Sequence, residues 1–138
     1  MSIQTESSGN LPAGVRLIAQ ALGGALLGLV FGAIAGTLGG RLFEGAEGFG
    51  NVVAAILGAI IGYTIGVSIG VYLIGRRLGV RGAYWRALLG GAIGSVLVML
   101  AAEPLRLNNN PAVLQAFLIG VPPIVAALGF NMGHKARR

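Results

Sequence analysis

Two glycine-rich apolar stretches decide the fold: residues 24–40, GALLGLVFGAIAGTLGG, and residues 58–70, GAIIGYTIGVSIG. In each stretch a glycine recurs at every fourth position. Positions four apart lie on one slowly turning stripe of an α-helix. A stripe without side chains lets a second helix approach closely inside a membrane. The pattern therefore predicts glycine-zipper packing of transmembrane helices, with a further step in a later span, through Gly24, Gly28, Gly32, Gly36, Gly40, Gly58, Gly62, Gly66, Gly70, Gly90 and Gly94.

The composition of the whole chain agrees with a membrane protein. Hydrophobic residues make up 55% of the 138 positions, glycine adds 25 residues, and charged residues amount to only 10%. Soluble domains carry about a quarter charged residues, and a chain this small could not bury so much apolar surface in water. These values exclude a soluble fold, a disordered chain and a nucleic-acid-binding domain. The net charge of +6 does not change this, because the ten Lys and Arg residues flank apolar runs instead of lining a polar helix face.

Four uncharged runs predict four transmembrane helices, at about 17–40, 51–74, 87–102 and 112–131. We expect an all-α, polytopic four-helix bundle, a single integral membrane domain over residues 1–138 with a flexible leader at 1–10. The third run is short, since 16 residues reach about 24 Å and the hydrocarbon core is about 30 Å thick. Interfacial Tyr84 and Trp85 and a snorkelling Arg86 would extend it, and a re-entrant segment is the alternative. The first run is too long for a cleaved signal peptide.

The basic residues predict the orientation. Arg16, the second loop and the C-terminal tail supply eight Lys and Arg residues, whereas Arg41 and Arg106 are the two on the other side. By the positive-inside rule, both termini and the second loop face the cytoplasm. The residues of that loop and tail act as a topology signal or bind anionic headgroups; they are Arg76, Arg77, Arg81, Arg86, Lys135, Arg137 and Arg138.

Pro122 and Pro123 interrupt the fourth run. Neither residue has an N–H group, so the carbonyls of Leu118 and Ile119 lose their usual partners. Pro123 also disfavours the α conformation of Pro122. We expect the fourth helix to be kinked or broken into two half-helices at this point. Broken helices form binding sites in transporters, but a packing kink is the simpler interpretation, because no charged or clustered polar group accompanies the prolines.

The glycine rows in four short spans, the segment GRRLG at 75–79 and the segment ALGFN at 127–131 resemble small bacterial glycine-zipper membrane proteins of uncharacterised function. The layout is also similar to that of the mitochondrial inner-membrane protein-translocase family. No functional motif of either group is matched, so no residue role is carried over. The first resemblance implies a bacterial inner membrane.

Function is the least specified property of this sequence. No span contains Asp, Glu, Lys, Arg or His, the groups that proton relays and ion-coupled carriers use. With no nucleophile–base pair and no metal cluster, we expect no enzyme, no cofactor and no metal. The first hypothesis is a non-catalytic accessory subunit whose glycine stripes pack into a homo-oligomer or a larger membrane complex. Its partners are then the lipid bilayer and other membrane helices, not nucleic acid. The alternative is a small channel or carrier with its site or gate at Pro122 and Pro123.

Overall fold

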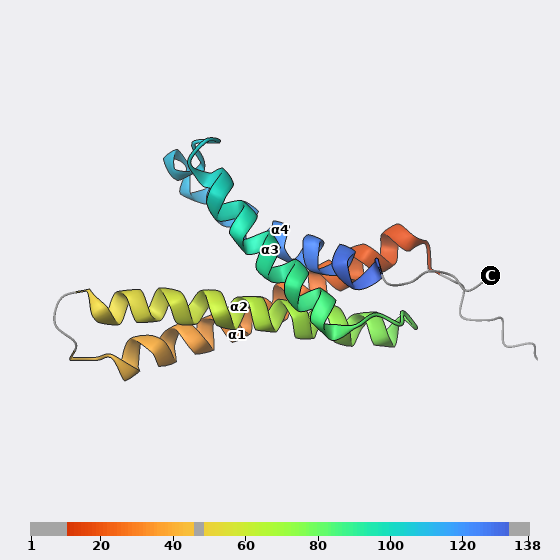
Figure 1. Cartoon of the computed structure of the whole chain (residues 1–138), viewed down its shortest axis with the longest axis horizontal. Coiled ribbons are helices and arrows are strands. Elements are labelled where there is room, and N and C mark those ends of the chain that lie inside the picture. Colours follow the sequence, from red (N-terminus) through yellow and green to blue (C-terminus); the bar gives the residue numbers. More distant parts are fainter. Residues whose placement is uncertain (1–10, 46–48, 133–138) are drawn as a thin grey trace, which may run out of the picture.

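The chain forms four long α-helices and one short 3₁₀ helix in a computed structural model that describes residues 11–45 and 49–132 (Figure 1). The α-helices are α1 (Ala13–Leu42), α2 (Gly50–Arg77), α3 (Tyr84–Ala102) and α4 (Pro111–Asn131), and the 3₁₀ helix is η1 (Leu107–Asn109). No strand occurs within the described ranges, which confirms the all-α prediction. The predicted leader 1–10 and the tail residues Lys135, Arg137 and Arg138 lie outside these ranges.

Each of the four α-helices is long and apolar enough to span a membrane, so the chain fits an integral membrane protein. Helix α3 begins at Tyr84, so Tyr84, Trp85 and Arg86, which were expected to extend the short third run, form its first turn. Its 19 residues reach about 28 Å, close to the roughly 30 Å of a hydrocarbon core. The side chains of Tyr84, Trp85 and Arg86 are amphipathic, so their apolar parts can lie in the membrane while their polar groups stay in contact with water.

Local sequence signals explain two helix ends. The C-terminus of α2 is a Schellman motif, in which Gly79 has φ +73°, Gly79 N–H donates to the Arg76 carbonyl and Val80 N–H donates to the Gly75 carbonyl. This motif turns the chain toward α3. At the start of α4, Pro111 occupies the first helical position and the Asn110 side chain accepts from Val113 N–H.

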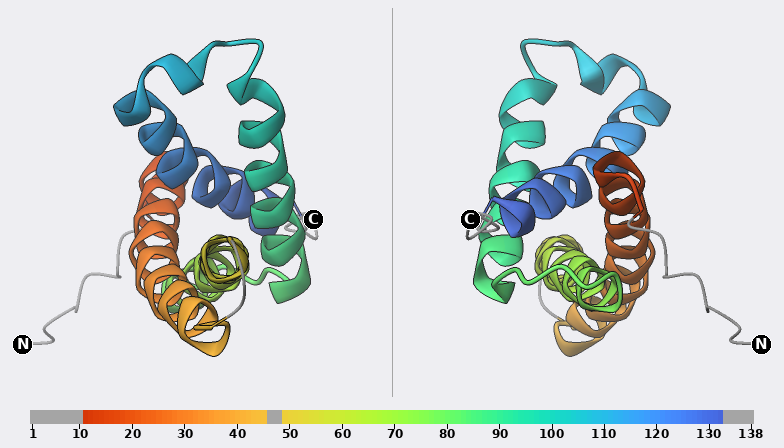
Figure 2. Two further views of the ribbon diagram at one scale, coloured as in Figure 1. Left: turned by 90° about the vertical axis from the view of Figure 1, so that its left-hand side faces the viewer. Right: turned by 90° about the vertical axis from the view of Figure 1, so that its right-hand side faces the viewer.

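The helices form two antiparallel hairpins, α1–α2 and α3–α4, which cross near one end and diverge toward the other (Figures 1 and 2). The N-terminal ends of α1 and α3 and the C-terminal ends of α2 and α4 lie at the first end, which we call the crossing end. Helix α1 packs against α2 and α4 but makes no contact with α3, whereas α2 touches all three other α-helices. The molecule is therefore V-shaped in profile, and the ends near Leu42 and Leu107 lie apart.

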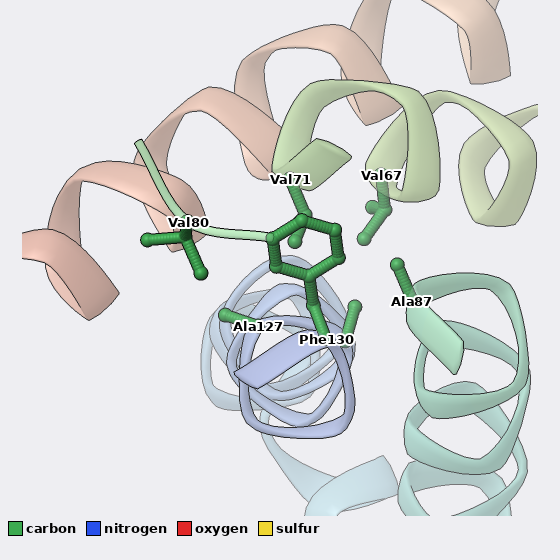
Figure 3. Packing of buried hydrophobic residues seen from close by; sticks show 7 residues of the cluster. Val67, Val71, Val80, Ala87, Ala127 and Phe130 are labelled. Carbon is green, nitrogen blue, oxygen red and sulfur yellow. The ribbon is translucent and has the colours of Figure 1, made fainter. Parts of the chain in front are cut away.

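The buried core lies where the hairpins cross (Figure 3). The Phe130 ring of α4 is fully buried and packs edge-to-face against Tyr72 of α2, with ring centroids 6.1 Å apart. The rest of this cluster consists of small side chains from α2, α3, α4 and the second loop: Val67, Val71, Val80, Ala87, Ala126 and Ala127. Large apolar side chains elsewhere on the helices point outward, as expected for surfaces that face lipid.

Candidate functional site

The glycine row of α2 lies directly against the backbone of α1. A Cβ added at Gly58, Gly62 or Gly66 would lie 2.5 Å from a carbonyl oxygen of α1. Each step of four residues along α2 moves four residues back along α1, as antiparallel helices require. The facing carbonyls are those of Ala35 for Gly58, Phe31 for Gly62, Leu27 for Gly66 and Gly23 for Gly70. The two backbones thus approach to a distance that leaves no room for a side chain.

The glycine row of α1 faces α2 in return, with slightly more space. Added Cβ atoms at Gly32 and Gly36 would lie 3.2 Å from α2 carbonyls, and at Gly40 the nearest atom is 3.4 Å away. At the crossing end Gly28 meets the side chains of Val67 and Tyr63, and Gly24 meets Val71 as well as Pro123 of α4. Both rows therefore face a helix of the same chain.

The third predicted pair of glycines joins α3 to α4. A Cβ added at Gly90 would lie 2.6 Å from the Val125 carbonyl, and one at Gly94 would lie 2.7 Å from Pro122 Cα. Close approaches also occur at glycines that the interval of four does not include: Gly23, Gly39, Gly75, Gly82 and Gly129. Gly23 and Gly39 directly precede Gly24 and Gly40 of the α1 row, and these glycine pairs were the sequence signal from which the two extra close approaches could have been predicted.

The proline pair is fully buried, and α4 continues through it as one helix from Pro111 to Asn131. The alternative of two separate half-helices was therefore wrong, while the kink stays a prediction. One reason for continuity lies in α2. In an unbroken helix residue 123 would donate its N–H to the Ile119 carbonyl, but Pro123 has no N–H. The Tyr63 hydroxyl donates to this carbonyl instead, at 2.8 Å. Neighbouring helices commonly satisfy backbone groups freed by proline in this way.

A cleft of about 360 Å³ opens where the hairpins begin to diverge. We call it the central cleft. Two polar side chains contribute to its surface, and both are engaged: Tyr63 with Ile119, and Ser95 with the carbonyl of Gly91 in its own helix at 3.0 Å. The lining combines residues from all four α-helices near their midpoints: Leu29, Gly32, Ala33, Ala59, Ile60, Tyr63, Ser95, Met99, Leu118 and Ile119. Such a surface suits an apolar occupant with one or two hydrogen-bonding groups.

An amide pair, buried on the Gln20 side, links the two hairpins at the crossing end. Asn131 Nδ2 of α4 donates to Gln20 Oε1 of α1 at 2.6 Å and to the Ala127 carbonyl. Gln20 is fully buried, and its Nε2 has no hydrogen-bond partner among the described residues. Both residues stood out in the sequence as polar positions in apolar runs, but their pairing across 111 positions had no local signal.

The arginines of the second loop gather at the crossing end. Arg76 donates to the Tyr72 hydroxyl at 3.1 Å, and the Arg86 guanidinium carbon lies 5.6 Å from the centroid of the Trp85 ring. Arg76, Arg77 and Arg81 are exposed, whereas Arg86 is half-buried. The carboxylates of the described residues are Glu44 and Glu103, which follow α1 and α3 at the opposite ends of the hairpins. No carboxylate of residues 11–45 or 49–132 therefore lies beside this cluster of positive charge.

The described part of the chain contains no group of three or more His, Cys, Asp or Glu residues that could hold a metal. Comparisons with protein-family models, with curated proteins and with solved structures found no match for this chain.

Proposed function

We propose that this protein is a non-catalytic accessory subunit of a larger membrane complex, and that the central cleft receives a transmembrane helix of a partner. In this proposal the glycine rows act as zippers that make each hairpin rigid. Because the rows face helices of the same chain, the contact with a partner uses the central cleft, whose lining includes Gly32 of the α1 row.

The observation that carries this proposal is the divergence of the hairpins over an apolar cleft with a small-residue wall (Figure 1). Gly32, Ala33 and Ala59 lie side by side on that wall. Small residues favour helix association in lipid, because they let backbones approach and gain van der Waals contact that acyl chains do not match. A rigid V-shaped frame with such a wall is suited to hold a further helix.

Site-specific photocrosslinking in native membranes tests this function. A photoreactive amino acid in place of Met99, which lines the central cleft, is expected to form a discrete protein adduct. The matched control is the next residue, Leu100, which is 69% exposed and lies outside the cleft. Lipid adducts alone at Met99, or the same protein adducts at both positions, would contradict the accessory-subunit proposal.

A carrier is the second candidate function, and the Tyr63–Ile119 hydrogen bond is the observation that favours it. This bond places a hydroxyl and a carbonyl beside Pro122 and Pro123, near the midpoints of α2 and α4, on the surface of the central cleft. Transporters bind their substrates near the middle of the membrane, and α4 would need to open at the prolines to release the carbonyl of Ile119 for a solute. Solute-selective flux into liposomes that disappears in the Pro122→Ala/Pro123→Ala double variant would favour the carrier, and absence of flux in the unmodified protein would eliminate it.

For localisation, we propose a bacterial inner membrane with the crossing end on the cytoplasmic side. The ends of α1 and α4 nearest the termini and the arginine-rich second loop lie at that end of the molecule, which supports the orientation expected from the positive-inside rule.

A further inference from the structure

A groove runs along the outside of the α3–α4 hairpin, starting at the crossing end. Its volume is about 520 Å³. Two glycines, Gly90 and Gly129, form part of the lining, where α3 and α4 approach closely: a Cβ added at Gly129 would lie 2.8 Å from the Arg86 carbonyl. We call this the α3–α4 groove and define it by the side chains that shape it, Trp85, Arg86, Leu89, Ile93, Val125 and Leu128.

Polarity changes along this groove in the direction of the α3 axis. Trp85 and Arg86 belong to the first turn of α3, the turn that follows the second loop. Leu89 and Ile93 follow about one and two turns deeper, so that Ile93 lies about 10 Å below Arg86 along the helix. Both are about half-exposed, as is Leu128 on the α4 side. The groove is thus an apolar trough with one cationic rim.

Arg86 supplies the positive charge of this groove. No carboxylate of the described residues lies at this end of the molecule. The guanidinium group stacks near the Trp85 ring at 5.6 Å, an arrangement that leaves N–H donors free at its edge. A guanidinium group matches a phosphate with two parallel hydrogen bonds. Arg76, Arg77 and Arg81 add positive potential nearby, which favours a headgroup of net negative charge over a zwitterionic one.

From this arrangement we infer that the α3–α4 groove binds one anionic phospholipid. Its phosphate is held by Arg86, and one of its acyl chains lies along Leu89, Ile93 and Leu128. Charge complementarity selects the headgroup, and the apolar trough positions the chain. This site is separate from the central cleft, which opens between the two hairpins, so the inference does not depend on the accessory-subunit proposal.

The single tryptophan of the chain provides a direct probe, because Trp85 lies at the rim of the groove. The full-length protein is reconstituted into phosphatidylcholine vesicles that contain increasing fractions of brominated phosphatidylglycerol or of brominated phosphatidylcholine. Bromine quenches tryptophan fluorescence on contact. We expect half-maximal quenching at a roughly fivefold lower mole fraction of the brominated phosphatidylglycerol, the preference that one arginine near an anionic headgroup supplies.

The variants separate the groove from general surface charge. In Arg86→Gln the preference for brominated phosphatidylglycerol is expected to fall to the remainder that Arg76, Arg77 and Arg81 supply. Arg86→Lys retains more of it, because lysine keeps the charge but cannot form two parallel hydrogen bonds to a phosphate. Arg77→Gln is the matched control: it removes one charge at the same end, outside the groove. Circular dichroism establishes that each variant is folded.

Two results would overturn the inference. One is equal quenching by both lipids in the unmodified protein. The other is an equal loss of preference in Arg77→Gln and Arg86→Gln, which would assign the effect to net charge and not to a defined groove.

Discussion

Replacing Gly62 with alanine is expected to force α1 and α2 apart at the point where their backbones touch. The added Cβ would lie 2.5 Å from both the carbonyl oxygen of Phe31 and the Cβ of Ala35. Neither neighbour is the flexible end of a side chain, so the strain is relieved only if the helices separate.

The size of the effect follows from these distances. Carbon atoms pack best at about 3.5–4.0 Å, so the helices must move apart by roughly 1 Å near Gly62. A gap of that size forfeits about a quarter to a half of each nearby van der Waals contact, which is worth about 0.1–0.2 kcal/mol. Summed over the neighbouring turns, we expect the free energy of unfolding to fall by about 1–3 kcal/mol, the usual range for overpacking.

The assay is equilibrium unfolding in mixed micelles of a mild detergent and sodium dodecyl sulfate. Separation of α1 from α2 is followed by energy transfer between dyes on two introduced cysteines, which is straightforward because the chain has none of its own. Gly120→Ala is the control for helix propensity, since nothing lies within 4 Å of a Cβ at that position. Gly40→Ala is the control within the row, because its nearest neighbour is at 3.4 Å.

The reasoning predicts an order as well as a magnitude. Relative to Gly120→Ala, the loss at Gly62 exceeds that at Gly36, where the closest atom is 3.1 Å away, and Gly40 shows almost none. Equal effects at Gly62 and Gly40 would refute the interpretation that backbone contact at the glycine rows holds this hairpin together.

Of three further predictions, the first two are measured in the same micelles and the third in sealed membrane vesicles. Tyr63→Phe removes the hydroxyl that donates to the Ile119 carbonyl and is expected to lower the free energy of unfolding by about 1 kcal/mol. In a Pro123→Ala background the alanine N–H donates to that carbonyl, so Tyr63→Phe is expected to lower the free energy by less. Strict additivity of the two substitutions in the double-mutant cycle would contradict this assignment. Gln20→Met removes a buried donor without a partner, so the free energy of unfolding is expected to stay the same or rise. Asn131→Ala leaves both polar atoms of Gln20 without a partner and is expected to lower the free energy of unfolding by about 1–3 kcal/mol. A single cysteine in the second loop is expected to react with an impermeant maleimide only from the cytoplasmic side, and cysteines in the first and third loops only from the opposite side; labelling of the first loop from the cytoplasm would reject the proposed orientation.

The number and type of helices could be predicted because each depends on a local property. An apolar run of membrane length must satisfy its own backbone hydrogen bonds in lipid, and only a helix does so within one segment. The extension of the third helix to Tyr84 is also local, because Arg86 has a long apolar stem that lets a helix continue into the interface.

The pairing of the functional groups could not be predicted in the same way. Tyr63 is one of three tyrosines in the sequence, and nothing within its own helix indicates that its hydroxyl reaches the carbonyl of Ile119. The central cleft likewise depends on the angle between two hairpins, to which residues from four helices contribute.

The sequence by itself determined four membrane-length helices, the glycine rows on two of them, and the carbonyls of Leu118 and Ile119 that the prolines leave without a backbone donor. Tertiary structure alone decided that the first two rows face each other within one chain, that the hairpins diverge, and that Gln20 meets Asn131. The physical reason is that helical periodicity specifies which residues share a face, whereas lipid is as apolar as the helices and does not select which faces meet. That selection depends on the fit of whole surfaces, a property of helices taken together.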